Sequence, residues 1–344
     1  MTAIVTTIGP VSQDLDTLNF FREHNVEIAR LNFSHGTSVW HIETGIKARQ
    51  AGLKLMLDLA GPKVLIGDLE NSVELVSGSV LAIEKQQDGK VYPLSEKVGG
   101  EDRLILPSLF DLSKFVAVGH PVLIDDGKVI LEVVEVTGNQ AICKVSHGGL
   151  VKNHKGINLP ETQLDIDFLV ERDREMLTAT INELKPEIVA PSFVKTVKDL
   201  HLLKDFLKSI ITIEGYFPEI CTKVEMGEAV KKDNLEAIVD NSEIIMIARG
   251  DLALEAQPLH IMVPFLQEEI IAVCRAKNKP FIVATQILET MSACPVPTRS
   301  EVSDLYRAVI INKANYVMLS GESAAGQFPR KCVELMSDMI KMAD

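Results

Sequence analysis

The stretch EIIMIARGD, residues 243–251, decides the fold: it is a short run of aliphatic residues that ends in a cation, a glycine and a carboxylate. Seven further runs of similar length and composition occur, most of them separated by segments long enough to hold a helix. Such runs are typical of buried parallel strands. Together they predict a closed (β/α)8 barrel, in which the carboxyl ends of the strands carry the chemistry. The other runs are residues 3–9, 26–33, 53–59, 187–193, 219–225, 279–286 and 315–321.

The interval between the third and fourth runs is longer than the others, and its pattern differs. Period-two alternation interrupted by turn residues such as Thr137-Gly138-Asn139 predicts a small antiparallel β domain there. We therefore expect a barrel domain of residues 1–62 and 168–344 and an inserted β-rich domain of residues 63–167, able to act as a lid over the barrel. Alternating segments include 80–84, 129–136 and 141–145. Helices are predicted from 3.6-residue apolar spacing over 197–207, 262–277, 301–313 and 330–342.

The composition limits the class of protein. The chain has 344 residues, 46% of them hydrophobic, and a formal net charge of −13. This acidity argues against a nucleic-acid partner and against an anionic membrane surface, and no apolar run is long enough to span a membrane. The five cysteines have no CxxC spacing, so we expect neither disulfides nor bound zinc. Because a strand-like run begins at residue 3 and leaves no room for a signal peptide, we expect a cytoplasmic enzyme.

Polar residues mark the ends of the second and third runs. Arg30, Asn32 and Ser34 occupy alternate positions, so their side chains should lie on the same side of the strand. An arginine at such a strand end can hold a phosphate or a carboxylate through two hydrogen bonds. The alternative is a structural ion pair that caps a layer of the barrel. Asp58 ends the third run and, taken alone, fits a loop-capping role equally well.

The ends of the fifth and sixth runs give a sharper signal. Lys223 and Glu225 lie on the same side of one strand end, and Asp251 follows the next strand. Two carboxylates on adjacent strands, completed by water and substrate, are a usual site for Mg²⁺, and a neighbouring lysine stabilises a developing enolate or a transferred phosphoryl group. A purely structural Lys223–Glu225 pair is the alternative. The N–H groups around Gly250 can bind a substrate carboxylate, and Thr285 supplies a hydroxyl at the seventh strand end.

Eight short strings, in the same order along the chain, resemble the pyruvate kinase family. They are residues 7–10 (TIGP), 29–36 (ARLNFSHG), 124–127 (IDDG), 155–160 (KGINLP), 248–252 (ARGDL), 284–289 (ATQILE), 297–301 (PTRSE) and 318–322 (MLSGE). The resemblance extends over the whole chain. It implies an α/β fold in which a (β/α)8 TIM barrel is interrupted after its third strand by a small β-barrel lid domain. It also implies phosphoryl transfer between phosphoenolpyruvate and ADP, which gives pyruvate and ATP.

The resemblance further implies roles for individual residues. Lys223 would neutralise charge on the phosphoryl group and the enolate, Arg30 would hold the phosphoryl group, and Thr285 would lie near the carbon that is protonated. Substrate would also contact Gly250 and Asp251. The residues implied to bind a divalent cation, Mg²⁺ or Mn²⁺, are Glu225 and Asp251. The residues implied to surround a monovalent cation are Asn32, Ser34, Asp58 and, through its carbonyl, Leu59, while those implied to approach the nucleotide are Lys155 and His35.

Residues 58–65, DLAGPKVL, depart from the family pattern DTKGPEIR. Ala60 and Leu65 replace a lysine and an arginine, which removes positive charge from the region of the transferred phosphoryl group. Lys63 replaces the usual glutamate, a change that in some family members places an ammonium near the potassium site, so we expect activity without K⁺. Arg307 stands where the family has an amide residue; it either replaces the missing guanidinium or is an exposed helix residue.

Two further expectations come from the length of the chain and from its missing cations. The chain ends at the final barrel helix, so we expect no C-terminal regulatory domain, no allosteric control by sugar phosphates and a homodimer. The loss of cations leaves open a specialised relative with metal-dependent enolpyruvate or oxaloacetate chemistry, such as a decarboxylase, a tautomerase or a carbon–carbon lyase. A non-catalytic keto-acid-binding regulator is a third alternative. The retained polar residues at positions 30, 223, 225, 251 and 285 argue against that regulator.

Overall fold

The computed structural model describes residues 2–92, 96–98, 101–162, 166–255 and 260–343. The chain divides into two compact units. The first unit consists of Met1–Pro62, Asp167–Ala253 and Ile261–Asp344, and the second of Lys63–Ile166 with a short segment that begins at Leu254. The sequence predicted boundaries after residues 62 and 167, and the segments of the two units end at Pro62 and Ile166. Within the expected insertion, residues 93–95, 99–100 and 163–165 lie outside the described part of the chain.

Parallel strands of the first unit close into a barrel, in the order β1-β18-β17-β16-β15-β14-β3-β2. The pairing of β1 with β18 completes the ring. Each predicted run supplies one strand, so the TIM-barrel prediction is confirmed. The barrel strands are β1 (Ala3–Thr7), β2 (Val26–Asn32), β3 (Lys54–Asp58), β14 (Ile188–Ala190), β15 (Glu219–Val224), β16 (Ile244–Ala248), β17 (Phe281–Ala284) and β18 (Tyr316–Leu319).

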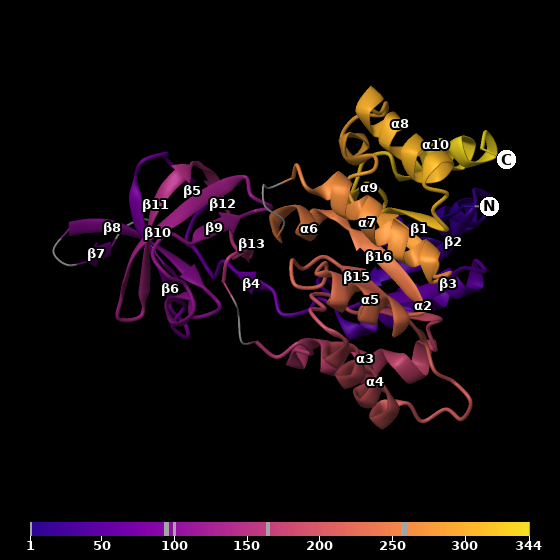
Figure 1. Cartoon of the computed structure of the whole chain (residues 1–344), viewed down its shortest axis with the longest axis horizontal. Coiled ribbons are helices and arrows are strands. Elements are labelled where there is room, and N and C mark those ends of the chain that lie inside the picture. Colours follow the sequence, from indigo (N-terminus) through magenta and orange to yellow (C-terminus); the bar gives the residue numbers. More distant parts are fainter. Residues whose placement is uncertain (1, 93–95, 99–100, 163–165, 256–259, 344) are drawn as a thin grey trace. The chain divides into compact units, whose positions relative to one another are not determined.

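Helices follow the barrel strands and cover the outside of the barrel (Figure 1). Some of the helix starts carry capping side chains: Asp14 accepts a hydrogen bond from the Thr17 N–H, and Thr196 with Asp199 forms a capping box. The predicted helix 301–313 changes character at Arg307, where a π-helical turn, Arg307–Ile311, begins. The helices are α1 (Leu15–Glu23), α2 (Ser38–Gln50), α3 (Glu171–Leu184), α4 (Val197–Ile210), α5 (Lys232–Asp240), α6 (Arg249–Glu255), α7 (Val263–Ala276), α8 (Arg299–Tyr306), α9 (Gly321–Ala324) and α10 (Pro329–Lys341).

The inside of the barrel changes from apolar to polar along its axis. Apolar side chains from most of the strands form one buried cluster, which includes Ile28 of β2, Met56 of β3 and Cys221 of β15. Because side chains alternate along a strand, the residue two positions further on also faces inward. These residues are Arg30, Asp58 and Lys223, and all three are buried. A charged layer therefore lies directly on an apolar floor at the carboxyl ends of the strands, which we call the mouth; the opposite end is the base.

The second unit is built on a sheet with the order β4-β13-β9-β10-β11-β6-β8-β7 and has its own apolar core. Most pairs are antiparallel, and the predicted turn at Gly138-Asn139 joins β10 to β11. Strands β6 and β8 are an exception to the antiparallel prediction, because the long connection between them lets the chain return in the same direction. Its strands are β4 (Val64–Leu65), β5 (Val73–Leu75), β6 (Val80–Lys85), β7 (Glu96–Val98), β8 (Glu101–Ser108), β9 (Pro121–Ile124), β10 (Val129–Thr137), β11 (Gln140–His147), β12 (Gly149–Val151) and β13 (Gly156–Asn158).

Among the residues that the structure describes, none of the helices combines the length and the apolar character that crossing a bilayer requires. The longest helices instead present one buried face to the barrel, as in α4, where Leu200, Leu203 and Leu207 are buried. This spacing explains why the helices lie against the strands.

Candidate active site

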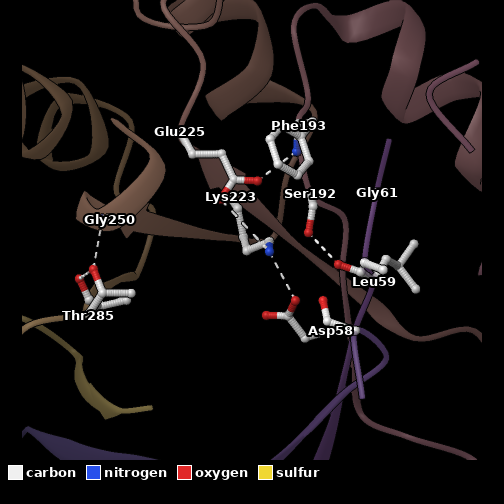
Figure 2. Close-up of polar contacts among 12 residues, drawn as sticks. Asp58, Leu59, Gly61, Ser192, Phe193, Lys223, Glu225, Gly250 and Thr285 are labelled. Carbon is white, nitrogen blue, oxygen red and sulfur yellow. Dashed lines mark hydrogen bonds and ion pairs between the residues drawn. The ribbon is translucent and has the colours of Figure 1, made fainter. Parts of the chain in front are cut away.

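Four buried charged side chains meet at the mouth of the barrel. The Arg30 guanidinium donates through Nε to Asp58 Oδ2 at 2.7 Å. Lys223 Nζ donates to the other oxygen, Oδ1, at 2.9 Å (Figure 2). Lys223 Nζ also lies 3.8 Å from Glu225 Oε2. Asp58 and Glu225 are each only 1% exposed. Two cations and two carboxylates thus neutralise one another in a region shielded from water. Buried charges are tolerated only when they are paired in this way.

The protonation states within this cluster are set by the neighbouring charges. Burial by itself raises the pKa of Asp58, but the Arg30 guanidinium and the Lys223 ammonium outweigh it and hold the pKa below its usual value. Burial likewise lowers the pKa of Lys223, but the Asp58 and Glu225 carboxylates outweigh it and hold the pKa above its usual value. Lys223 is therefore a fixed ammonium at neutral pH. Such a group stabilises negative charge and does not act as a base.

The Arg30 guanidinium is fixed from a second side. Its Nη1 donates to Thr7 Oγ1 at 2.7 Å, and the Thr7 hydroxyl donates to the Leu319 carbonyl at 2.9 Å. The contacts with Asp58 and Thr7 use two of the five N–H donors of the guanidinium. Arg30 therefore forms the buried ion pair that was one interpretation of the sequence, and it keeps donors for an anionic ligand, as the other interpretation requires.

The two carboxylates predicted to bind a divalent cation come from adjacent strands. Glu225 directly follows β15, and its Oε1 accepts a hydrogen bond of 2.7 Å from the Phe193 N–H (Figure 2). Asp251 lies in the first turn of α6, which follows β16, the parallel neighbour of β15. In the described part of the chain, no group of three or more His, Cys, Asp and Glu side chains could hold a metal. Two carboxylates nevertheless fit Mg²⁺, which usually keeps several waters and binds substrate phosphates.

Thr285 and Gly250 form a second polar group at the mouth. Thr285 Oγ1 accepts a hydrogen bond of 2.9 Å from the Gly250 N–H, so this N–H already has a partner within the protein (Figure 2). Thr285 and Gln286 have left-handed backbones, with φ of 67° and 53°. Arg249 supports this strained turn by donating to the Thr285 carbonyl at 2.6 Å, and it pairs with Asp304 at 2.7 Å. Arg249 thus holds Thr285 at the strand end.

The oxygens implied to bind a monovalent cation lie at the ends of β2 and β3. Asn32 Oδ1 accepts a hydrogen bond of 3.0 Å from the Ser34 N–H, and the Leu59 carbonyl accepts one from the Ser192 hydroxyl. Both carboxylate oxygens of Asp58 bind the cations described above. The oxygens of Asn32, Asp58 and Leu59 therefore each accept a hydrogen bond from the chain itself.

A family model described as pyruvate kinase, barrel domain, matches residues 1–333. The chain belongs to the pyruvate kinase family. It is 36% identical to a pyruvate kinase of Agrobacterium vitis, with 99% of this chain and 68% of the relative covered. It is 34% identical to one of Bacillus licheniformis, with 100% and 57% covered, and 35% identical to one of Geobacillus stearothermophilus, with 97% and 55% covered. The chain thus spans between 55% and 68% of the length of these three pyruvate kinases.

These comparisons confirm the family that the sequence motifs predicted, and they support a phosphotransferase enzyme of the pyruvate kinase type. Members of the pyruvate kinase family generally need a divalent metal and act on small-molecule substrates. The four buried charges at the mouth are consistent with such an enzyme. The roles of the individual residues stay predictions.

The two residues implied to approach the nucleotide have different surroundings. His35 is exposed in the loop after β2, and its carbonyl lies 2.8 Å from His41 Nε2. Lys155 belongs to the second unit, where its Nζ lies 2.8 Å from Asp125 Oδ1. Within that unit the ion pair holds the ammonium next to the IDDG turn, residues 124–127. His35 therefore belongs to the first unit and Lys155 to the second.

The residues that depart from the pyruvate kinase pattern occur in both units. Ala60 has no cationic group, and its backbone N–H donates to Asp173 Oδ1 at 2.9 Å. Leu65 lies in β4 of the second unit, opposite Gly156. Arg307 pairs with Glu268 of α7 at 2.9 Å, and its side chain is 52% exposed. Arg307 is therefore an exposed residue of the helical layer, which agrees with the interpretation of it as an exposed helix residue.

Sequence reasoning missed three residues beside the site. Asp173 is buried in the first turn of α3, where it accepts hydrogen bonds from the backbone of residues 60 and 61. Ser192 and Phe193 follow β14 and bind Leu59 and Glu225. No local motif marks these residues, because Asp173 and Ser192 are 113 and 133 residues away from Ala60 and Leu59 in the sequence.

Proposed function

We propose that this chain transfers the phosphoryl group of phosphoenolpyruvate to ADP, giving pyruvate and ATP. The observation that carries the proposal is the buried charge cluster of Arg30, Asp58, Lys223 and Glu225 in the barrel of a pyruvate kinase family member. Removing four charges from water is costly, and such clusters are typical of functional sites. The cluster also contains the charges that phosphoryl transfer requires.

The chain's own residues would act by positioning and by neutralising charge. Arg30 would bind the phosphoryl oxygens through the N–H donors that Asp58 and Thr7 leave unused. The Lys223 ammonium would stabilise the charge that develops between the phosphoryl group and the enolate oxygen. Thr285 would lie near the carbon of the enolate that takes up a proton. Phosphoryl transfer depends mainly on positioning and on charge neutralisation, and needs little covalent chemistry from the protein. Arg30, Lys223 and Thr285 are groups of the types that this requires.

We propose that Glu225 and Asp251 hold Mg²⁺ or Mn²⁺. When bound, such an ion supplies positive charge to phosphate and enolate oxygens. Glu225 is suited to this role because the Phe193 N–H fixes one of its oxygens at 2.7 Å. The absence of a larger carboxylate group among the described residues agrees with an ion that keeps waters and substrate as ligands.

We propose that K⁺ is not required. The candidate oxygens of Asn32, Asp58 and Leu59 each accept a hydrogen bond from the chain, so they are already held in place without an added ion. Lys63 supplies an ammonium in place of the usual glutamate. Assays in potassium chloride and in tetramethylammonium chloride should give the same rate, and a rate that rises with K⁺ would contradict the proposal.

Further features of the pyruvate kinase assignment are proposals of the same kind. We propose that Lys155 and His35 contact the nucleotide, that residues 63–167 act as a lid, and that the protein is a cytoplasmic homodimer. The ammonium of Lys155 and the exposed ring of His35 are chemically suited to a diphosphate and a nucleobase. Light scattering on the purified chain measures its mass directly and would separate a dimer from a monomer or tetramer.

The deciding experiment is an incubation with phosphoenolpyruvate, Mg²⁺ and ADP, in which pyruvate and ATP are both measured. We expect equal amounts of the two products from the wild type and at least about 1000-fold slower formation of both from Lys223→Met. A parallel incubation with oxaloacetate and Mg²⁺ contains no nucleotide. Pyruvate that forms only in this second incubation would overturn phosphoryl transfer.

The second candidate function is metal-dependent enolpyruvate or oxaloacetate chemistry, as in a decarboxylase, a tautomerase or a carbon–carbon lyase. It is favoured by Ala60 and Leu65, which replace two cations of the family pattern. Such reactions pass through an enolate and need Lys223 and the divalent cation, but they need no charge for a nucleotide. Adding ADP should leave their rate unchanged, which separates this function from the first.

A further inference from the structure

Three residues outside the proposed substrate contacts hold the turn that follows β3, residues 59–62. Asp173 of α3 and the pair Ser192 and Phe193 after β14 bind or pack against this turn from two sides. We call Asp173, Ser192 and Phe193 the turn clamp. The chain passes from the first unit to the second directly after this turn, at Pro62, and returns at Asp167. The clamp therefore lies where the chain leaves the barrel unit.

The Asp173 side of the clamp is a buried carboxylate with two backbone partners. Asp173 is fully buried, and its two oxygens accept hydrogen bonds from the Ala60 N–H at 2.9 Å and the Gly61 N–H at 2.8 Å. Burial raises the pKa of Asp173, and these two N–H donors oppose the rise only in part. A buried carboxylate must be hydrogen-bonded, so the two N–H donors that satisfy Asp173 also fix the turn that carries them.

The other side of the clamp connects the turn to the metal carboxylate. Ser192 donates to the Leu59 carbonyl, and the next residue, Phe193, donates from its N–H to Glu225 (Figure 2). Phe193 has a left-handed backbone, with φ of 57°. Gly61 packs so closely that a Cβ there would lie 2.6 Å from Phe193 Cδ2. If the turn moved, Gly61 would displace Phe193, and the hydrogen bond from the Phe193 N–H would move the Glu225 carboxylate.

We propose that the turn clamp is a positioning device, which fixes the Glu225 carboxylate relative to the Leu59 carbonyl and Asp58. Its residues act through Glu225 and Leu59 and do not touch the substrate. The proposal deepens the proposed function and rests on it, because it assigns Glu225 to a divalent cation. Strain at a non-glycine residue such as Phe193 persists only where the surrounding contacts enforce it, and here those contacts lead to Glu225.

The test compares Asp173→Asn and Ser192→Ala with the control Glu187→Gln. Glu187 also accepts a hydrogen bond from the backbone of β3, from the Leu55 N–H at 2.8 Å, but at the base of the barrel. Mn²⁺ binding to the whole chain is measured by calorimetry without substrate, together with kcat, KM for phosphoenolpyruvate and Tm. The partners of metal ligands typically change affinity by about 10-fold to 100-fold, so we expect both clamp variants to raise the Mn²⁺ dissociation constant at least about tenfold.

A merely structural role would lower Tm and leave the Mn²⁺ dissociation constant of the folded protein unchanged, and we expect only this from Glu187→Gln. If Ser192→Ala and Asp173→Asn both bind Mn²⁺ as tightly as the wild type, the clamp proposal is overturned. Should Asp173→Asn fail to fold, Ser192→Ala decides alone, because it removes one hydroxyl and one hydrogen bond. A wild type that binds Mn²⁺ but makes no ATP would overturn the proposed function, while the dissociation constants would still decide the clamp.

Discussion

The strand pair β2–β3 carries one ion pair at the mouth of the barrel and one at the base, and the two differ mainly in their exposure to water. Arg30 Nε lies 2.7 Å from Asp58 Oδ2 at the mouth, and Lys54 Nζ lies 2.7 Å from Glu27 Oε1 at the base. The side chains of the mouth pair are 10% and 1% exposed, whereas those of the base pair are 53% and 32% exposed. Equal distances therefore occur in very different surroundings.

This difference shows why the mouth, and not the base, is the candidate for chemistry. An exposed ion pair contributes at most about 1 kcal/mol, and it costs little to form. A buried pair costs several kcal/mol in desolvation, which is often not recovered from the attraction of its charges. The backbone pairing from Ile28 with Lys54 to Asn32 with Asp58 already joins β2 to β3, so neither ion pair is needed to hold the strands together. The cost of burying the charges at the mouth supports the proposal that a ligand binds there.

The largest effect is expected from Lys223→Met at the mouth. Its ammonium stabilises charge mainly in the transition state, and removal of one such group typically costs about 100-fold to 1000-fold in kcat. We expect kcat to fall at least about 1000-fold, because the variant also leaves Asp58 and Glu225 without their shared cation. Steady-state kinetics with phosphoenolpyruvate and ADP measure the loss, and calorimetry with oxalate tests whether ligand binding persists.

The matched control for this variant is Lys54→Met, the same substitution in the exposed pair at the base. It should keep the kcat of the wild type, because Lys54 lies at the other end of the strands. A Lys223→Met enzyme with a kcat comparable to that of the wild type would remove the distinction between the two ends.

A smaller effect, on stability, is expected from Asp58→Asn. This variant leaves two buried cations, Arg30 and Lys223, without the carboxylate that both contact. Removing one partner of a buried ion pair typically lowers the free energy of unfolding by about 3 to 5 kcal/mol. Urea denaturation of the variant and the wild type measures the difference. A loss no larger than that of an exposed pair would contradict the role of burial in the comparison.

The stability contributed by Asp58 should also depend on pH in the acid range. Its pKa in the folded protein lies below the usual value of about 3.9, despite burial, because Arg30 and Lys223 favour the charged form. The contribution is therefore fully present above about pH 4 and is lost as the pH falls through the folded-state pKa. Denaturation curves between about pH 6 and about pH 3 should show a flatter decline for Asp58→Asn than for the wild type. Parallel declines would contradict this assignment.

The smallest effect is expected at the base. Lys54→Met removes the exposed pair with Glu27 and should lower the free energy of unfolding by no more than about 1 kcal/mol, because solvent screens both charges. Thermal denaturation at low and at high salt measures this contribution. A loss as large as that of Asp58→Asn would show that exposure does not separate the two ends.

Much of the barrel and part of the site could be predicted from local patterns. Runs of aliphatic residues located each barrel strand, and period-two spacing placed Arg30 with Asn32, and Lys223 with Glu225, on one side of their strands. The adjacency of β15 and β16 then followed from barrel topology, which brought Glu225 and Asp251 to neighbouring strand ends. These inferences succeed because alternation and strand order are properties of the backbone.

The rest of the site depends on contacts that no local pattern encodes. Asp58 was consistent with loop capping until the structure showed it between two cations from other strands. The run at 187–193 was predicted as one strand, but β14 ends at Ala190, and Phe193 turns into a left-handed conformation to reach Glu225. Asp173 has its partners 113 and 112 residues away. Only the folded chain brings these groups together.

The apolar floor beneath Arg30, Asp58 and Lys223 separates the charged layer from the base of the barrel. A cavity at the base is lined by Ile28 of this floor, whereas Met56 is fully buried within the packed cluster. A ligand of the charged layer would therefore enter and leave on the side of the mouth. Under the proposed function, substrate and product would share that route, and a product that dissociates slowly would delay the next turnover.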